Sequence, residues 1–230
     1  MSNEALTHVR FQSRMKMAIS FGARIADDAI TPSDRHWEVQ MRKLIYSMNT
    51  SLDGYVESSD GNFGWGTHDA EILMHYSALY ADMTTHLYGR RMWETMSGYW
   101  PTAEADPAGT PETREFARYW NAGEYFVFSR SLQSVDYGAR LVRDNAVETV
   151  RQLKSGQGSD MDVGGPGLAS TLIAAGLVDE IHAYINQVAI GAGKAFLPDL
   201  PRQLDLKLLG VHTFASGVVQ LCYATRTTSG

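Results

Sequence analysis

Cysteine is almost absent from this sequence of 230 residues, which contains Cys222 and no other. An intrachain disulfide is therefore excluded, and no cluster of thiolates can hold a metal ion. No group of His, Cys and carboxylate residues has the spacing of a metal site either, so we expect no metal. A chain without disulfides is typical of a reducing compartment, and we predict a cytoplasmic protein.

Long apolar runs and an excess of basic charge are missing too. No run approaches the roughly 20 residues of a membrane-spanning helix, and "MAISFGA" is too short and badly flanked for the apolar region of a signal peptide. Lys and Arg number 20 against 26 Asp and Glu, so the net charge is -6. No overall positive field attracts nucleic acid or an anionic membrane. We expect a small-molecule substrate as the partner.

Residues 1–40 differ from the rest of the chain. They carry five basic and five acidic residues, show no clear strand pattern and precede a second methionine, Met41. We expect them to form an N-terminal extension that is either poorly ordered or packed on a partner subunit. Residues 41–230 are expected to form the functional domain, because the regular patterns begin there.

Strand-like and helix-like segments alternate from residue 43 onward. Apolar residues at three-and-four spacing predict a helix over 69–83, and Thr110 followed by Pro111 predicts the start of another over 111–121. Further helices are predicted over 144–155 and 167–177. A buried strand is predicted from residue 43 to the turn at Asp53 and Gly54. Further strands are predicted over 85–89, 124–129, 161–165, 179–190, 206–214 and 217–225. Alternation followed by a final hairpin indicates an α/β domain with a mostly parallel central sheet, flanking helices and an antiparallel C-terminal edge.

Three predicted strand ends carry chemistry suited to phosphate. In "LYGRRMWE", Arg90 and Arg91 lie where a helix begins, a position that the helix dipole makes unfavourable for cations unless an anion binds there. In "VFSRSL", Ser129 and Arg130 offer a hydroxyl and a guanidinium, which suit a phosphate monoester such as the 2'-phosphate of NADP.

In "DVGGPGLAS", glycines leave the backbone bare before a helix, so that a pyrophosphate could approach. Each signal alone is more often an ordinary turn or a solvated pair, and the inference depends on all three occurring in order. The pattern is neither the G-x-G-x-x-G fingerprint of a Rossmann domain nor a Walker loop.

The succession "SLDGYV", "LYGRRMWE", "VFSRSL", "DVGGPGLASTLI", "LVDEIHAYI" and "GAGKAFLP" resembles the dihydrofolate reductase-like superfamily. Within it the chain is most similar to the C-terminal reductase domain of the bifunctional riboflavin-biosynthesis protein. The resemblance covers about residues 41–226. It implies an eight-stranded, mostly parallel sheet, NADPH as hydride donor and, commonly, a homodimer.

The resemblance also implies which residues bind the cofactor. Ser129 and Arg130 match the segment that recognises the adenosine ribose phosphate, and Gly164 and Gly165 match a double glycine that is often joined by a cis peptide. Met92 departs from the pattern, because many relatives carry threonine there and a thioether cannot donate a hydrogen bond to phosphate. The full set of expected cofactor residues is Gly89, Arg90, Arg91, Met92, Ser129, Arg130, Gly164, Gly165, Pro166, Gly167 and Leu168.

Carboxylates are the candidates on the substrate side, because a reductase needs a proton source. Asp53 matches the acidic residue after the first strand of the riboflavin-type branch, but a turn-forming aspartate is the alternative. Asp69 and Glu71 lie where true dihydrofolate reductases hold the pterin, and Asp69 could equally cap a helix. Trp65 is a candidate to stack on a heterocycle. His68 and Lys194 are weaker candidates, for a proton donor and for an anionic group of the substrate.

Together these features predict an NADPH-dependent reductase of small heterocyclic or carbonyl or imine substrates, resembling the riboflavin-pathway pyrimidine reductase. Dihydrofolate reduction, a non-catalytic nucleotide-binding module and a flavin in place of NADPH are the alternatives. NADPH is expected over NADH, since no acidic residue closely follows Arg130 in the sequence. A two-fold homodimer is expected through an exposed edge or face of 180–190 and 217–225, with Ile185, Val188 and Val219 near the contact.

Overall fold

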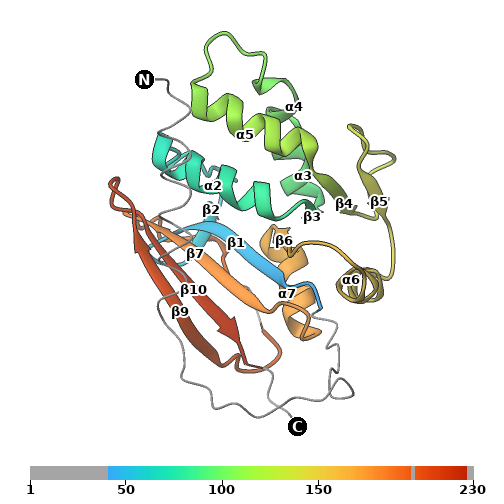
Figure 1. Ribbon diagram of the computed structural model, residues 1–230. Helices are drawn as coiled ribbons and strands as arrows, with labels where there is room; N and C mark the ends of the chain where they lie inside the picture. Colours follow the sequence, from blue (N-terminus) through green and yellow to red (C-terminus); the bar gives the residue numbers. More distant parts are fainter. Residues whose placement is uncertain (1–40, 198–199, 227–230) are drawn as a thin grey trace, which may run out of the picture. The chain divides into compact units, whose positions relative to one another are not determined.

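An eight-stranded sheet forms the centre of the part of the chain that the structure, a computed structural model, describes, residues 41–197 and 200–226 (Figure 1). Its strand order is β5-β4-β3-β6-β1-β7-β10-β9. The expectation about residues 1–40 lies outside the described residues. The strands of this sheet are β1 (Leu44–Ser51), β3 (Thr85–Gly89), β4 (Glu124–Phe128), β5 (Arg140–Val142), β6 (Met161–Gly164), β7 (Glu180–Asn186), β9 (Leu206–Thr213) and β10 (Val219–Thr225).

The first six strands in this order are parallel to one another, and β10 pairs antiparallel with both β7 and β9. The predicted fold class, a mostly parallel sheet with an antiparallel C-terminal edge, is therefore confirmed. Of the expected exposed edge or face, the edge was assigned to the wrong strands, and the face stays a prediction. β7 and β10 lie inside the sheet, and β9 is its C-terminal edge.

Helices cover both faces of the sheet, as a parallel sheet requires. Figure 1 shows α2 and α5 on one side and α7 on the other. Sequence patterns missed the short elements β2, β5, β8 and α4, where β2 and β8 form a separate two-stranded sheet. The remaining elements are α2 (Ala70–Asp82), α3 (Arg90–Ser97), α4 (Trp100–Ala103), α5 (Pro111–Ala122), α6 (Ala146–Ser155), α7 (Pro166–Ala174), β2 (Tyr55–Ser58) and β8 (Gly193–Ala195). None of the helices in the described ranges is long and apolar enough to cross a membrane.

The two faces of the sheet differ in polarity. The face toward α6 and α7 is apolar and packs around side chains such as Leu87, Val163 and Ile181 in one buried cluster. Because side chains alternate along a strand, the intervening residues point to the other face, toward α2. Buried polar side chains on that face include His86, Tyr88, Asp162, His182, Tyr184 and Gln220. The position of these polar groups indicates on which side of the sheet to look for a site.

Candidate functional site

A cavity of about 1010 Å³ extends between α2 and the polar face of the sheet, beside the carboxyl ends of β1, β3 and β6. Its size is at the upper end of the range for small-molecule and cofactor sites. Aromatic and methionine side chains from α2, α3 and α5 form much of the wall. These are Tyr76 and Tyr80, Met92 and Met96, and Phe116, with Trp100 from α4 and with Phe63, Trp65 and Tyr99 from the connecting segments.

The junction between β3 and α3 opens into this cavity. Gly89 caps α3 in an extended conformation with φ −72° and ψ 164°, and no side chain accepts from the first N–H groups of the helix. The guanidinium groups of Arg90 and Arg91, the first two residues of the helix, follow at once. Arg90 Nη1 donates to Glu94 Oε1 at 3.2 Å, and Arg91 Nη1 donates to Glu57 Oε1 at 2.8 Å. This arrangement offers an anion two cations and free backbone donors.

The junction between β6 and α7 lies beside the first one. A Cβ on Gly164 would come within 2.9 Å of Met92 Cγ and of the Tyr88 ring, so the packing admits only glycine there without a shift. Gly165 has φ +98°, a value that L side chains rarely adopt, and it caps α7. A Cβ on Gly89 would lie 3.8 Å from Leu168 Cβ, which shows how close the two junctions are.

Pro166, Gly167 and Leu168 line the same cavity as Gly165 and as the β3–α3 junction. Two of the three predicted junctions are thus brought together. The peptide between the two glycines departs from the expectation for the superfamily, because no cis peptide occurs in the described ranges. Met92, the residue that departs from the family pattern, packs directly over Gly164.

The third junction lies outside the residues that line the cavity. Ser129 Oγ accepts from the N–H groups of Ser131 and Leu132, at 3.2 and 3.1 Å, and so shapes its own turn. The Arg130 side chain is 86% exposed, and its Nε lies 3.5 Å from Asp144 Oδ1. The sequence led us to expect no acidic residue nearby, but Asp144 follows β5, the strand that pairs with β4. Pairing of the strands, and not the sequence distance, puts this carboxylate beside Arg130.

Asp53 does not line the cavity within the described residues. Its carboxylate accepts from Ser51 Oγ at 2.6 Å and from the N–H groups of Ile190 and Gly191 at 3.1 and 2.7 Å. The Ser51 hydroxyl, followed by these backbone donors, lowers the pKa of the Asp53 carboxyl. The geometry favours the turn-forming role over proton donation, because a carboxylate held by three donors is stabilised in its ionised form.

Asp69 and Glu71 hold α2 in place. Asp69 Oδ1 accepts from the N–H of Ile72 at 2.9 Å, which is the bond of an N-cap. Glu71 Oε2 accepts from the N–H of Ala215 at 2.8 Å and ties α2 to the turn between β9 and β10. Neither lines the cavity in the described part of the chain. Their positions favour the helix-capping and anchoring roles over contact with a substrate.

Trp65, His68 and Lys194 do line the cavity. Trp65 Nε1 donates to the carbonyl of Asn62 at 3.2 Å, which holds the indole against the segment between β2 and α2. Lys194 lies on β8 opposite Glu57 of β2. Trp65 and the two weaker candidates therefore line the cavity, whereas the three carboxylates proposed from the sequence do not.

Sequence reasoning missed Asp162, a buried carboxylate that lines the cavity from β6. Its Oδ1 is hydrogen-bonded to Nδ1 of His86 on the neighbouring β3. Beside this pair, the hydroxyls of Tyr80 and Tyr88 bond to each other, and burial holds the pKa of both phenols well above its usual range. The available signal was an aspartate inside the predicted strand "MDVGG", because a strand of a parallel sheet is expected to be apolar on both faces.

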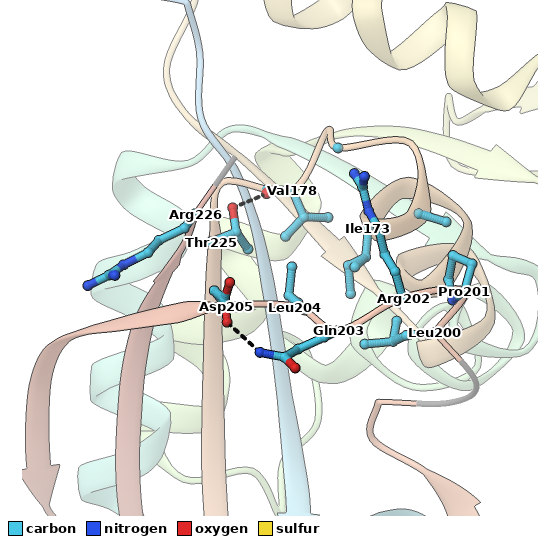
Figure 2. Close-up of a pocket in the computed structure, with 12 residues that line it drawn as sticks. Ile173, Val178, Leu200, Pro201, Arg202, Gln203, Leu204, Asp205, Thr225 and Arg226 are labelled. Atoms are coloured by element: carbon cyan, nitrogen blue, oxygen red, sulfur yellow. Dashed lines mark hydrogen bonds between the residues drawn. The ribbon is translucent and has the colours of Figure 1, made fainter. Parts of the chain in front are cut away.

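A second hollow in the described structure is much smaller, about 50 Å³, and lies between the end of α7 and the segment 200–205 (Figure 2). Figure 2 shows Gln203 Nε2 donating to Asp205 at 2.8 Å and Thr225 Oγ1 donating to the carbonyl of Val178 at 2.7 Å. A space of this size holds a few water molecules at most. The large cavity is therefore the candidate site.

Comparison with known proteins gives a consistent assignment. The family model of the RibD C-terminal domain matches residues 42–220. The chain is 33% identical over 187 residues to the uncharacterised protein YyaP of Bacillus subtilis (strain 168), covering 80% of this chain and 96% of that protein.

Two solved structures share the fold. A putative riboflavin biosynthesis protein from Shewanella sp. PV-4 superposes with a TM-score of 0.64 at 18% identity, covering 81% of this chain and 100% of that one. Dihydrofolate reductase from Enterococcus faecalis, complexed with NADP(H) and RAB-propyl, gives a TM-score of 0.55 at 12% identity, covering 80% and 97%.

The tight packing at Gly164 leads to a first prediction. Gly164→Ala should lower the free energy of unfolding by about 1–3 kcal/mol, because the added methyl group meets the fully buried Tyr88 ring. Gly167→Ala is the matched control, since a Cβ there meets nothing within 4 Å and the position is helical. That control should be neutral or stabilise by about 0.5–1 kcal/mol. Urea unfolding measures both, and equal effects would contradict the packing argument.

The hydrogen bonds of Asp53 lead to a second prediction, in which Asp53→Ala lowers the Tm. The pKa of this carboxyl in the folded chain lies below its ordinary value of 3.8. Its contribution to stability is therefore fully present above that pH and is lost as the pH falls through the lower folded pKa. The difference in Tm between wild type and variant, measured by circular dichroism, should be constant near neutral pH and shrink as the pH falls below 3.8. A variant with unchanged Tm but abolished turnover would assign Asp53 to proton donation instead.

Proposed function

The chain belongs to the family of the RibD C-terminal domain, and on that premise we propose that it is an NADPH-dependent reductase of small heterocyclic, carbonyl or imine substrates. The observation that carries the proposal is the meeting of two bare helix N-termini, those of α3 and α7, at one large cavity. A pyrimidine related to those of the riboflavin pathway is the first candidate substrate. The cytoplasmic location stays a prediction.

The residues at the two junctions fit a dinucleotide. Arg90, Arg91 and the first N–H groups of α3 would hold phosphate, and the stretch from Gly165 to Leu168 would let a pyrophosphate approach α7. When bound, NADPH supplies the hydride. The NADP(H) complex of the enterococcal dihydrofolate reductase, which has the same fold, supports this choice of cofactor.

The rest of the cavity fits a flat substrate. Trp65, Phe63 and Tyr76 supply aromatic surface on which a heterocycle can stack. Oxidation of NADPH, followed by its absorbance, against a panel of a ribosylaminopyrimidine, dihydrofolate, small imines and enones identifies the substrate class. Turnover of dihydrofolate alone would favour the alternative of dihydrofolate reduction, and turnover of none would favour a non-catalytic nucleotide-binding module.

Cofactor titration provides the third prediction. The purified chain should bind NADPH at sub-millimolar concentration and more tightly than NADH or FMN. Arg130→Ala should weaken NADPH by about 1.5–3 kcal/mol, the contribution of a charge-assisted hydrogen bond, and should change NADH little. Asp144→Asn should tighten NADPH, because it removes the carboxylate that competes for Arg130.

Isothermal titration calorimetry distinguishes the outcomes of this experiment. An equal loss of NADPH and NADH affinity in Arg130→Ala would show that Arg130 does not read the 2'-phosphate. Tight FMN binding without NADPH binding would replace the cofactor, and binding of neither would contradict the proposed function.

A homodimer forms the fourth prediction, with its contact moved to the observed edge of the sheet. Ile185, Val188 and Val219 are half-buried, whereas three apolar side chains of the edge strand β9 are exposed. Leu208, Leu209 and Val211 are 51%, 49% and 57% exposed. An edge strand with such residues is a surface that a partner subunit can cover.

Light scattering on the full chain and on residues 41–230 tests the dimer. Both should have a dimeric mass, and Val211→Lys should shift both toward monomer. A monomeric mass for the shorter chain alone would assign assembly to residues 1–40, and two monomeric masses would refute the prediction.

A further inference from the structure

Asp162 is a carboxylate at the floor of the large cavity. It lies on β6 two residues before Gly164, which places it roughly 7 Å below the strand end at the usual rise per residue. The side chain is 9% exposed, and the residue lines the cavity. Oδ1 is bonded to His86 Nδ1, whereas no hydrogen bond from a described residue reaches Oδ2. One oxygen of a nine-tenths buried carboxylate is thus left for a ligand.

His86 does not cancel the negative charge of Asp162. The imidazole is fully buried, between the rings of Tyr80 at 4.2 Å and Tyr125 at 4.9 Å. Its Nε2 has no hydrogen-bond partner among the described residues. A proton on Nε2 would therefore be a buried donor without an acceptor, which is costly. The neutral imidazole, with its proton on Nδ1 donated to Asp162, avoids that cost.

The other carboxylates of the cavity wall already have cationic partners. Glu57 is paired with Arg91 and Glu94 with Arg90. Within the described ranges, Asp162 forms an ion pair with His86 and with no lysine or arginine. A buried carboxylate without a countercharge is unfavourable unless something else supplies one. A cationic ligand would do so.

The surroundings of Asp162 define the shape of such a ligand. Tyr76 and Tyr80 from α2, Phe116 from α5, and Met92 and Met96 from α3 line the inner cavity. We propose that this inner part binds a flat ring carrying a positively charged nitrogen, whose N–H group donates a hydrogen bond to Asp162. The inference rests on the proposed function in that this ring would belong to the reductase's substrate. His86 would act as a positioning residue that fixes the carboxylate.

Benzamidine and benzamide test the inference, because they share ring and shape and differ in charge. Ligand-observed NMR titration of the full chain, with no cofactor added, gives both dissociation constants. Benzamidine should bind at least about ten-fold more tightly, as expected for a hydrogen bond to a buried charge. If the dissociation constants of benzamide and benzamidine for the wild-type chain are about equal, so that their ratio is near one, the proposal is overturned without any variant.

Variants then locate the binding site. Asp162→Asn keeps the shape and can still accept from His86 Nδ1, but it removes the charge, so the ratio should fall to about one. Glu57→Gln and Glu94→Gln are matched controls that remove a charge elsewhere on the wall, and both should keep the ratio. An unchanged ratio in Asp162→Asn, or a lost ratio in either control, overturns the assignment.

The NADPH titration is run separately on the same preparations. A retained preference for benzamidine with no NADPH binding would refute the reductase and leave the cation site intact. NADPH binding with no preference for benzamidine would refute the cation site alone.

Discussion

A parallel sheet has to be covered by other elements on both faces. In this protein the helices on the two faces pack against side chains of different polarity. The face toward α6 and α7 buries mostly apolar side chains in one cluster, which is stabilised chiefly by close packing. The opposite face carries histidine, aspartate and tyrosine side chains, so its cover must supply hydrogen bonds as well as apolar surface. Tyr80 bonds to Tyr88, and His75 of α2 bonds to the hydroxyl of Tyr184. The large cavity lies along this second face. There α2 is joined to the sheet by hydrogen bonds at a few points, and its side chains do not fill all the space between the helix and the sheet.

The position of two arginines at the start of α3 follows from the same balance of charges. The helix dipole disfavours cations there, and the structure compensates with glutamates, one on the next turn of α3 and one on β2. The Arg90–Glu94 pair, with both side chains nearly half exposed, contributes little to stability. A phosphate could therefore replace Glu94 as the partner of Arg90 at small cost, so the site is held in place without a ligand and remains available to one.

The sequence predicted most of the fold because the signals for it are local. Apolar periodicity located α2, and the pair Thr110–Pro111 located the start of α5, where Thr110 Oγ1 accepts from the N–H of Thr113 at 3.2 Å. The roles of carboxylates depend instead on contacts that sequence spacing does not reveal. Asp53 binds Ile190 and Gly191, more than 130 residues away in the chain. Short elements such as β8 also escaped, since three residues give no period.

Asp53 lay in a turn and Asp69 at the start of a helix, and aspartate is common at both kinds of position for reasons unrelated to catalysis. Asp162 lay within a strand, where local preference is against it and only its surroundings can compensate its charge. In the cavity, Arg90, Arg91 and Lys194 gather near the strand ends, whereas Asp162 lies deeper along β6. Glu57 and Glu94 offset the two arginines, so one net positive charge, that of Lys194, remains near the strand ends, and Asp162 adds negative charge at the floor. The resulting field along the cavity would orient a ligand that carries an anionic group at one end and a cationic ring at the other, before any close contact selects it.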